Sequence, residues 1–272
     1  MTSFKETFGE FSATVHGVIV SSILIGGVVT SLFSGILADK YGRPLMISLG
    51  SLIFGIGAAL ETTAFHLPTF VVGRLVKGVG EGIFLSTVYV LVAELSPAKR
   101  RGTVANIPQL LITCGLLVGF FMCYGTARGL AAAGSLTWRL PLAIQAALAL
   151  ANAAATWFLV PQSPRWLLAQ GRVEHARAVI AALGLDPGEQ EELLLAAQAG
   201  ATSGSAALLL EHGRPDATLG ESVREAVRAF GEAFSAPVRA RTMFGCFLMA
   251  MQQFSGIEYV ISNTFSSISC LT

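Results

Sequence analysis

Residues 35–43 read GILADKYGR, a short charged stretch between two long apolar runs. Each run is long enough to cross a bilayer, for which a helix needs about 20 mainly apolar residues. The composition agrees, because only 13% of the residues are charged, whereas soluble domains average about 25%. Hydrophobic residues make up 53% of the 272-residue chain, and the mean hydropathy is +0.65. The stretch therefore predicts a loop between two spanning helices of an all-α membrane protein.

Apolar segments predict about six transmembrane helices along the chain. They lie at about 15–37, 45–64, 68–93, 103–125, 140–160 and 242–264. Lys and Arg are more frequent in loops 38–44 and 94–102 than in loops 65–67 and 126–139. Positive charges mark cytoplasmic loops, so the first two loops are expected in the cytoplasm and the N-terminus outside.

This pattern predicts three parts. Residues 1–160 form an N-terminal transmembrane bundle, residues 161–239 a cytoplasmic linker with short amphipathic helices, and residues 240–272 the first helix of a second bundle. Apolar residues at helical spacing, with charges between them, indicate the linker helices. A chain that begins outside without a signal sequence suggests that a first helix is missing. A net charge of +1 gives no indication of nucleic-acid binding.

The residue types in the charged stretch at 35–43 suit a turn between two helices. Asp39 ends one predicted helix, Gly42 permits a tight turn, and Arg43 precedes the next helix. The carboxylate can cap a helix N-terminus or pair with an arginine, and such a pair would break when two halves of a carrier move. The alternative is an ordinary loop whose scattered charges only set the topology.

Charges also occur inside a predicted span. Arg74, Lys77 and Glu81 lie in the run GRLVKGVGEG, and charged groups inside a membrane segment usually face the bundle interior. Lys77 and Glu81 are four residues apart and can neutralise each other on one helix face. Arg74 has no such partner and is expected to pair with another helix, unless it snorkels to the membrane surface.

The carboxylate-and-arginine pattern returns twice. Glu94 ends one predicted span and Arg101 begins the next, and residues 161–167, PQSPRWL, carry Arg165. The chain thus has an Asp-Gly-Arg loop, an arginine-and-glycine helix, a Glu-to-Arg loop and a Pro-Gln-Ser-Pro-Arg loop, in that order. In this order and on these sides, the motifs resemble the sugar porter family of the major facilitator superfamily.

The resemblance implies a major facilitator-type helical bundle that carries a hexose, pentose or polyol by alternating access. The carrier would be a facilitator or a proton symporter, in the plasma membrane, without a cofactor. The implied cytoplasmic gate comprises Asp39, Gly42, Arg43, Glu94, Arg101 and Arg165. Arg74 matches the position that takes part in proton coupling in some members.

Solute-binding residues also follow from the resemblance. Amides suit a hydroxyl-rich ligand because they both donate and accept hydrogen bonds. Gln109 matches a sugar-binding glutamine, with Ile112 lining the pocket, and the run QQFSGIEYV resembles the family's seventh-helix motif. The implied solute-binding residues are Gln109, Ile112, Gln252, Gln253 and Glu258. For Gln109 taken alone, an interhelical hydrogen bond is the alternative.

The chain also departs from the family pattern. Pro44 replaces a second basic residue, Gln162 replaces a glutamate, and Glu258 stands where a sugar-binding asparagine is usual. Tyr89 and Leu91 stand where the family usually has proline and tyrosine. Together with the expected absence of a first helix and of most of the second half, these departures suggest a fragment of a sugar porter.

A second hypothesis is a nutrient sensor that does not transport, or an inactive remnant of a sugar porter. An enzyme is the weakest candidate, since the chain has no nucleophile elbow, phosphate loop or metal-ligand cluster in its sequence. Its four histidines are dispersed, and its four cysteines, in or beside apolar segments, are interpreted as packing residues.

Overall fold

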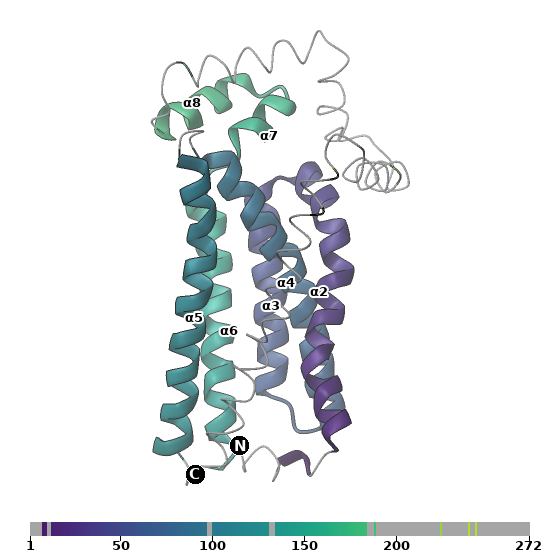
Figure 1. Cartoon of the computed structure of the whole chain (residues 1–272). Coiled ribbons are helices and arrows are strands. Elements are labelled where there is room, and N and C mark those ends of the chain that lie inside the picture. Colours follow the sequence, from purple (N-terminus) through teal and green to yellow (C-terminus); the bar gives the residue numbers. More distant parts are fainter. Residues whose placement is uncertain are drawn as a thin grey trace.

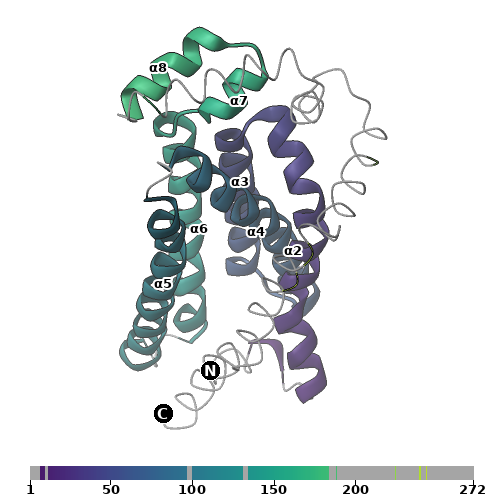
Figure 2. The ribbon, with the colours of Figure 1, turned by 45° about the horizontal axis from the view of Figure 1, so that its top comes forward.

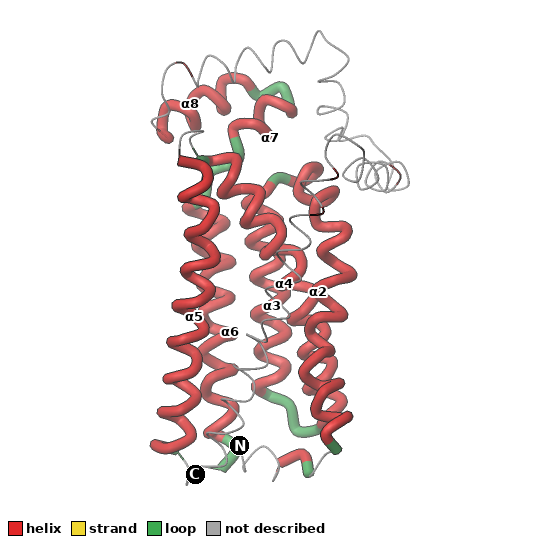
Figure 3. The backbone as a smooth tube through the Cα atoms, in the orientation of Figure 1, coloured by secondary structure: helices red, strands yellow, loops and turns green. Residues whose placement is uncertain are grey.

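The computed structural model describes residues 7–9, 12–96, 100–130 and 134–183, and the single residues 188, 224, 239 and 243. This part of the chain is helical (Figures 1 and 3). The helices are α2 (Ala13–Tyr41), α3 (Arg43–Thr62), α4 (Leu67–Leu95), α5 (Arg101–Gly129), α6 (Leu136–Leu159), α7 (Pro164–Ala169) and α8 (Val173–Leu183). Within the described ranges, the five helices from α2 to α6 are long and apolar enough to cross a membrane.

Five of the predicted spans are thereby confirmed, and the sixth, at 242–264, lies almost wholly outside the described residues. The start of α6 differs by about one turn, since the helix begins at Leu136 rather than at 140. Arg139, assigned from its charge to the preceding loop, lies in the first turn of α6. Its Nη2 donates to the backbone oxygen of Ala64, 3.0 Å away, and its guanidinium stacks on Phe65. These contacts satisfy the charge, so the helix can start earlier than hydropathy indicates.

A single residue separates α2 from α3. Gly42 has φ +94°, a conformation that favours glycine, and its N–H donates to the Ala38 oxygen at 3.0 Å. Pro44 then lies in the first turn of α3, where the missing N–H costs nothing and the fixed φ favours a helix. The departure at Pro44 therefore has a local structural role in starting α3.

Helix α3 lies between α4 and α6, while α2 packs on the other side of α4 (Figure 2). Glycines allow this close approach. A Cβ atom at Gly78 would collide with the backbone oxygen of Ile23 in α2, and one at Gly80 would collide with the backbone of Gly50 and Phe54 in α3. The positions of these three helices are therefore fixed by backbone contact.

Polar side chains join α3 to α6. Ser48 Oγ donates to the Ala153 oxygen at 2.7 Å, and Asn152 Nδ2 donates to Ser51 Oγ at 2.9 Å. Helix α5 differs, because most of its apolar side chains are exposed, among them Leu110, Leu117 and Phe121. Exposed apolar side chains on a helix of spanning length are what lipid contact requires.

The short helices α7 and α8 lie across the end of the bundle where α2 meets α3 (Figure 1). Gly171, with φ +73°, makes the turn between them, and Ala176 and Ile180 of α8 are buried. The first stretch for which the sequence predicts short amphipathic helices is therefore helical. The second predicted stretch, VREAVRAFGEAF, lies almost wholly outside the described residues.

Candidate functional site

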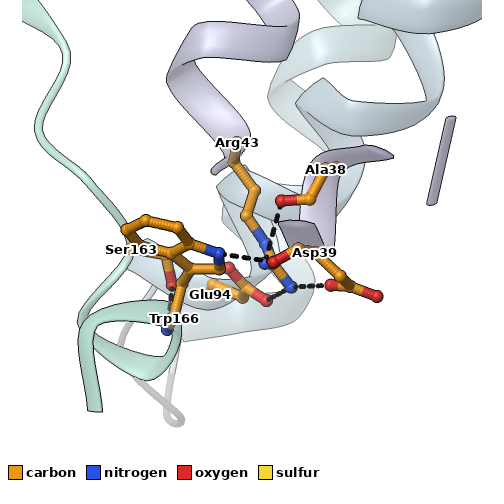
Figure 4. Close-up of polar contacts among 6 residues, drawn as sticks. All are labelled: Ala38, Asp39, Arg43, Glu94, Ser163 and Trp166. Atoms are coloured by element: carbon orange, nitrogen blue, oxygen red, sulfur yellow. Dashed lines mark hydrogen bonds and ion pairs between the residues drawn. The ribbon is translucent and has the colours of Figure 1, made fainter. Parts of the chain in front are cut away.

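Three helix ends meet at one arginine. Arg43, the first residue of α3, places Nη2 2.6 Å from Asp39 Oδ1 at the end of α2 and 3.2 Å from Glu94 Oε1 at the end of α4 (Figure 4). Its Nη1 donates to the Ala38 oxygen at 3.2 Å, one of the last carbonyls of α2. A cation at a helix C-terminus is favourable because the unpaired carbonyls there carry partial negative charge. One guanidinium thus joins α2, α3 and α4.

The members of this ion network differ in their access to solvent. The side chains of Arg43 and Glu94 are 11% and 13% exposed, whereas that of Asp39 is 33% exposed. Charge pairs gain strength as water is excluded, so the Arg43–Glu94 contact is the stronger restraint between helices, although Asp39 is nearer.

The linker contacts the same network through a tryptophan. Trp166 Nε1 donates to the Asp39 backbone oxygen at 2.7 Å, and Ser163 Oγ accepts from the Trp166 N–H at 3.5 Å to cap α7 (Figure 4). Gln162 lies against Gly42, where a Cβ atom would stand 2.7 Å from Gln162 Oε1. Gln162, which departs from the family pattern, and Trp166, to which the sequence assigned no role, therefore belong to one contact between the linker and the bundle.

One of the predicted gate residues, Arg165, is not brought into this network. Arg165 is exposed and makes no ion pair with the described residues. Successive helical residues point about 100° apart, so with Trp166 directed at Asp39, Arg165 points elsewhere. Arg101 begins α5, as predicted, but its side chain is not among those that the structure describes.

A second ion cluster lies between α3 and α4. Glu61, whose side chain is fully buried, has Oε2 2.7 Å from Lys77 Nζ and Oε1 3.9 Å from Arg74 Nε. Lys77 Nζ also lies 3.4 Å from Oε1 of Gln145 in α6. The expectation that Arg74 pairs with another helix agrees with this geometry. Glu61, rather than Glu81, is the hydrogen-bonded partner of Lys77.

Glu61 was missed by the sequence reasoning, although a signal for it exists. It is the one charged residue within the predicted span 45–64, and an ionisable residue inside a span is by default a candidate for function. Its pairing with Lys77 was not predicted because the two residues are 16 positions apart in the sequence and lie on different helices.

Polar groups also lie on the exposed side of α4 and α5. Gln109 Oε1 accepts from the hydroxyl of Tyr89 at 3.3 Å, and both side chains are exposed. Ile112, one turn further along α5, is 38% exposed on the same side of the helix. Tyr89, which departs from the family pattern, thus hydrogen-bonds to the side-chain oxygen of Gln109. The amide N–H groups of Gln109 are left available. Gln252, Gln253 and Glu258 lie outside the described residues.

Comparisons with known proteins agree on one family. The family model "Sugar (and other) transporter" matches residues 2–264. The glucose transporter GlcP of Staphylococcus epidermidis is 36% identical over 169 residues, 62% of this chain and 36% of that protein. The low-affinity glucose transporter HXT1 of Saccharomyces cerevisiae is 28% identical over 246 residues, 89% of this chain and 40% of that protein.

The fold has solved counterparts. The xylose transporter XylE from E. coli, in a partially occluded inward-open conformation, matches with a TM-score of 0.63 at 24% identity, over 77% of this chain and 55% of that one. The chain spans 32–36% of the length of three curated relatives that it matches. With five helices of spanning length in its described part and a family match that covers most of its residues, the chain is an integral membrane protein that belongs to the sugar (and other) transporter family.

Proposed function

We propose that the chain is part of a carrier that moves a hexose, pentose or polyol across a membrane by alternating access, as a facilitator or a proton symporter. The observation that carries the proposal is the Asp39–Arg43–Glu94 network, in which one cation joins the ends of three spanning helices. Ion pairs at one end of a bundle can break and re-form as the halves of a carrier move. The plasma membrane is the proposed location, with this end in the cytoplasm.

In this proposal, the network is the cytoplasmic gate. Arg43 is its centre, Asp39 and Glu94 are its carboxylates, and Gly42 gives the turn that brings Arg43 back onto α2. The linker contributes Trp166 to this gate, because the indole N–H donates a hydrogen bond to the backbone oxygen of Asp39 at the end of α2. Arg101 and Arg165 are proposed to join the gate in the state of the carrier in which the two halves meet.

The solute site is proposed to lie along α5. Gln109 and Ile112 would contact the solute, together with Gln252, Gln253 and Glu258 from the proposed second bundle at 240–272. Tyr89 fixes the amide of Gln109 through its acceptor oxygen. The N–H groups would then point to sugar hydroxyls, a donor arrangement that suits a neutral, oxygen-rich ligand.

Arg74 is the proposed point of proton coupling, if the carrier is a symporter. Its side chain is 23% exposed and lies beside the buried carboxylate of Glu61. A guanidinium in a spanning helix is costly and is retained where it serves a path for solute or ions.

The test is uptake of radiolabelled hexose, pentose and polyol into proteoliposomes that contain the chain. We expect saturable uptake of one class. In Tyr89→Phe, we expect the KM to rise about fivefold, the factor for one neutral hydrogen bond of about 1 kcal/mol. Tyr124→Phe is the matched control, because the Tyr124 hydroxyl makes no hydrogen bond to the described residues. Absence of both binding and uptake would refute the proposal, and binding without uptake would favour a sensor.

A further inference from the structure

The two oxygens of Glu61 are used unequally. Oε2 accepts a short hydrogen bond from Lys77 Nζ at 2.7 Å, while Oε1 stays 3.9 Å from Arg74 Nε. A separation of 3.9 Å is an ion pair but too long for a hydrogen bond. Neither Glu61 Oε1 nor Arg74 Nε has a hydrogen-bond partner among the described residues.

Lys77 is held in a way that fixes this asymmetry. Its side chain is 6% exposed, it reaches Gln145 Oε1 in α6 at 3.4 Å, and it lies over the ring of Phe54 at 5.6 Å. Glu81, one turn along α4, carries the opposite charge. With contacts to α3 and α6, Lys77 cannot follow a movement of Glu61, so the carboxylate remains turned towards Lys77.

Arg74 is held differently. Its guanidinium lies over the ring of Phe70 at 5.2 Å, and its charge is balanced by Glu61 across the longer gap. It makes no hydrogen bond to a side chain or backbone group of the described residues. The charge of Arg74 is therefore balanced by Glu61, while its N–H groups remain free of hydrogen bonds to the described residues.

We propose that Lys77 and Glu61 are positioning residues for Arg74. By holding the Glu61 carboxylate, Lys77 prevents a bidentate Glu61–Arg74 pair, and it keeps the guanidinium donors available to an acceptor in the transport path. Such bidentate pairs are the strongest that arginine forms with a carboxylate. The inference deepens the proposed function, since it names the residues that keep Arg74 competent for its role.

The test measures the availability of Arg74 directly. The purified chain in detergent is treated with phenylglyoxal, an arginine-selective dicarbonyl, and the modification rates of Arg74 and Arg177 are compared by peptide mass spectrometry. Arg177, whose side chain is 55% exposed, is the internal standard. In Lys77→Met, the buried carboxylate loses its donor and must turn to Arg74. We expect the Arg74 rate to fall about tenfold, which corresponds to about 1.4 kcal/mol, close to one hydrogen bond to a charged group.

Three further variants make the result decisive. Lys77→Arg keeps a cation for Glu61 and should leave the Arg74 rate unchanged. Glu61→Gln with Lys77→Met removes both charges and should restore the rate. Arg172→Gln, which removes an exposed charge just before α8 and leaves the Arg177–Glu174 pair in place, is the control for a charge change elsewhere.

An unchanged Arg74 rate in Lys77→Met would overturn the inference, as would an equal loss in the double variant. A Lys77→Met protein that fails to fold while the double variant folds would also overturn it, because the inference requires Glu61 to re-pair with Arg74. The assay needs no transport. A chain that labels as expected but takes up no solute would count against the proposed function alone.

Discussion

Replacing Arg43 by methionine removes a cation that Asp39 and Glu94 share, together with its hydrogen bond to the Ala38 oxygen. Methionine keeps much of the side-chain length and the helix propensity, so the change is mainly one of charge. The Glu94 side chain, 13% exposed, would then lose its only ion-pair partner in the described part of the chain.

The expected loss of stability follows from the burial of each contact. Removing one partner of a buried pair costs about 3–5 kcal/mol, and an exposed pair contributes about 0.2–1 kcal/mol. Because both contacts of Arg43 keep some exposure, the lower end applies, about 3 kcal/mol in all. At about 2–4 °C per kcal/mol for a chain of this size, the Tm should fall by about 6–12 °C.

The assay is thermal unfolding in detergent, followed by tryptophan fluorescence and helical circular dichroism. Arg177→Met is the matched control. It removes the Arg177–Glu174 pair, which is 3.7 Å long and exposed on both sides, and it should lower the Tm by less than about 4 °C. Equal Tm shifts in the two variants would show that Arg43 contributes no more than an exposed surface charge, and they would refute the reasoning from burial.

Two other perturbations test the packing. Gly78→Ala should lower the free energy of unfolding by about 1–3 kcal/mol, because the added methyl group collides with the Ile23 oxygen. Gly115→Ala is the control, since a Cβ atom there has nothing within 4 Å. It should be neutral or stabilising in the same Tm measurement. Trp166→Phe keeps an aromatic ring but removes the 2.7 Å bond to the Asp39 oxygen. It should weaken the attachment of α7 by about 1 kcal/mol, and limited proteolysis should cut the linker faster; an unchanged cleavage rate would mean that the indole bond does not hold the linker.

Much of the fold was predictable from the sequence because lipid imposes a length on apolar runs. The break at Gly42 was predictable too, since a charged stretch with glycine interrupts two such runs. The start of α6 was not, because Arg139 is accommodated by a carbonyl and a ring that belong to other segments. Hydropathy treats each charge as exposed to water or lipid and takes no account of a partner supplied by the fold.

The candidate site divides in the same way. Asp39 and Arg43 are four residues apart across the tight turn at Gly42, so their pairing follows from local spacing. Glu94 joins them from 51 residues away, and the motif order suggested this only through the family resemblance. The partners of Glu61 and Trp166 could not be assigned, because they depend on the packing of α3 on α4 and of α7 on the end of α2.

The two ends of the bundle are fastened by different forces. At one end, Arg43 relies on carboxylates that keep partial contact with water. At the other, Arg139 relies on the Ala64 carbonyl and on the rings of Phe65 and Trp138. Dissolved ions weaken an ion pair more when it is in contact with water, and they have little effect on a hydrogen bond between a guanidinium and a buried backbone oxygen. Raising the salt concentration would therefore weaken the partly exposed Asp39 contact most and leave the Arg139 end unchanged.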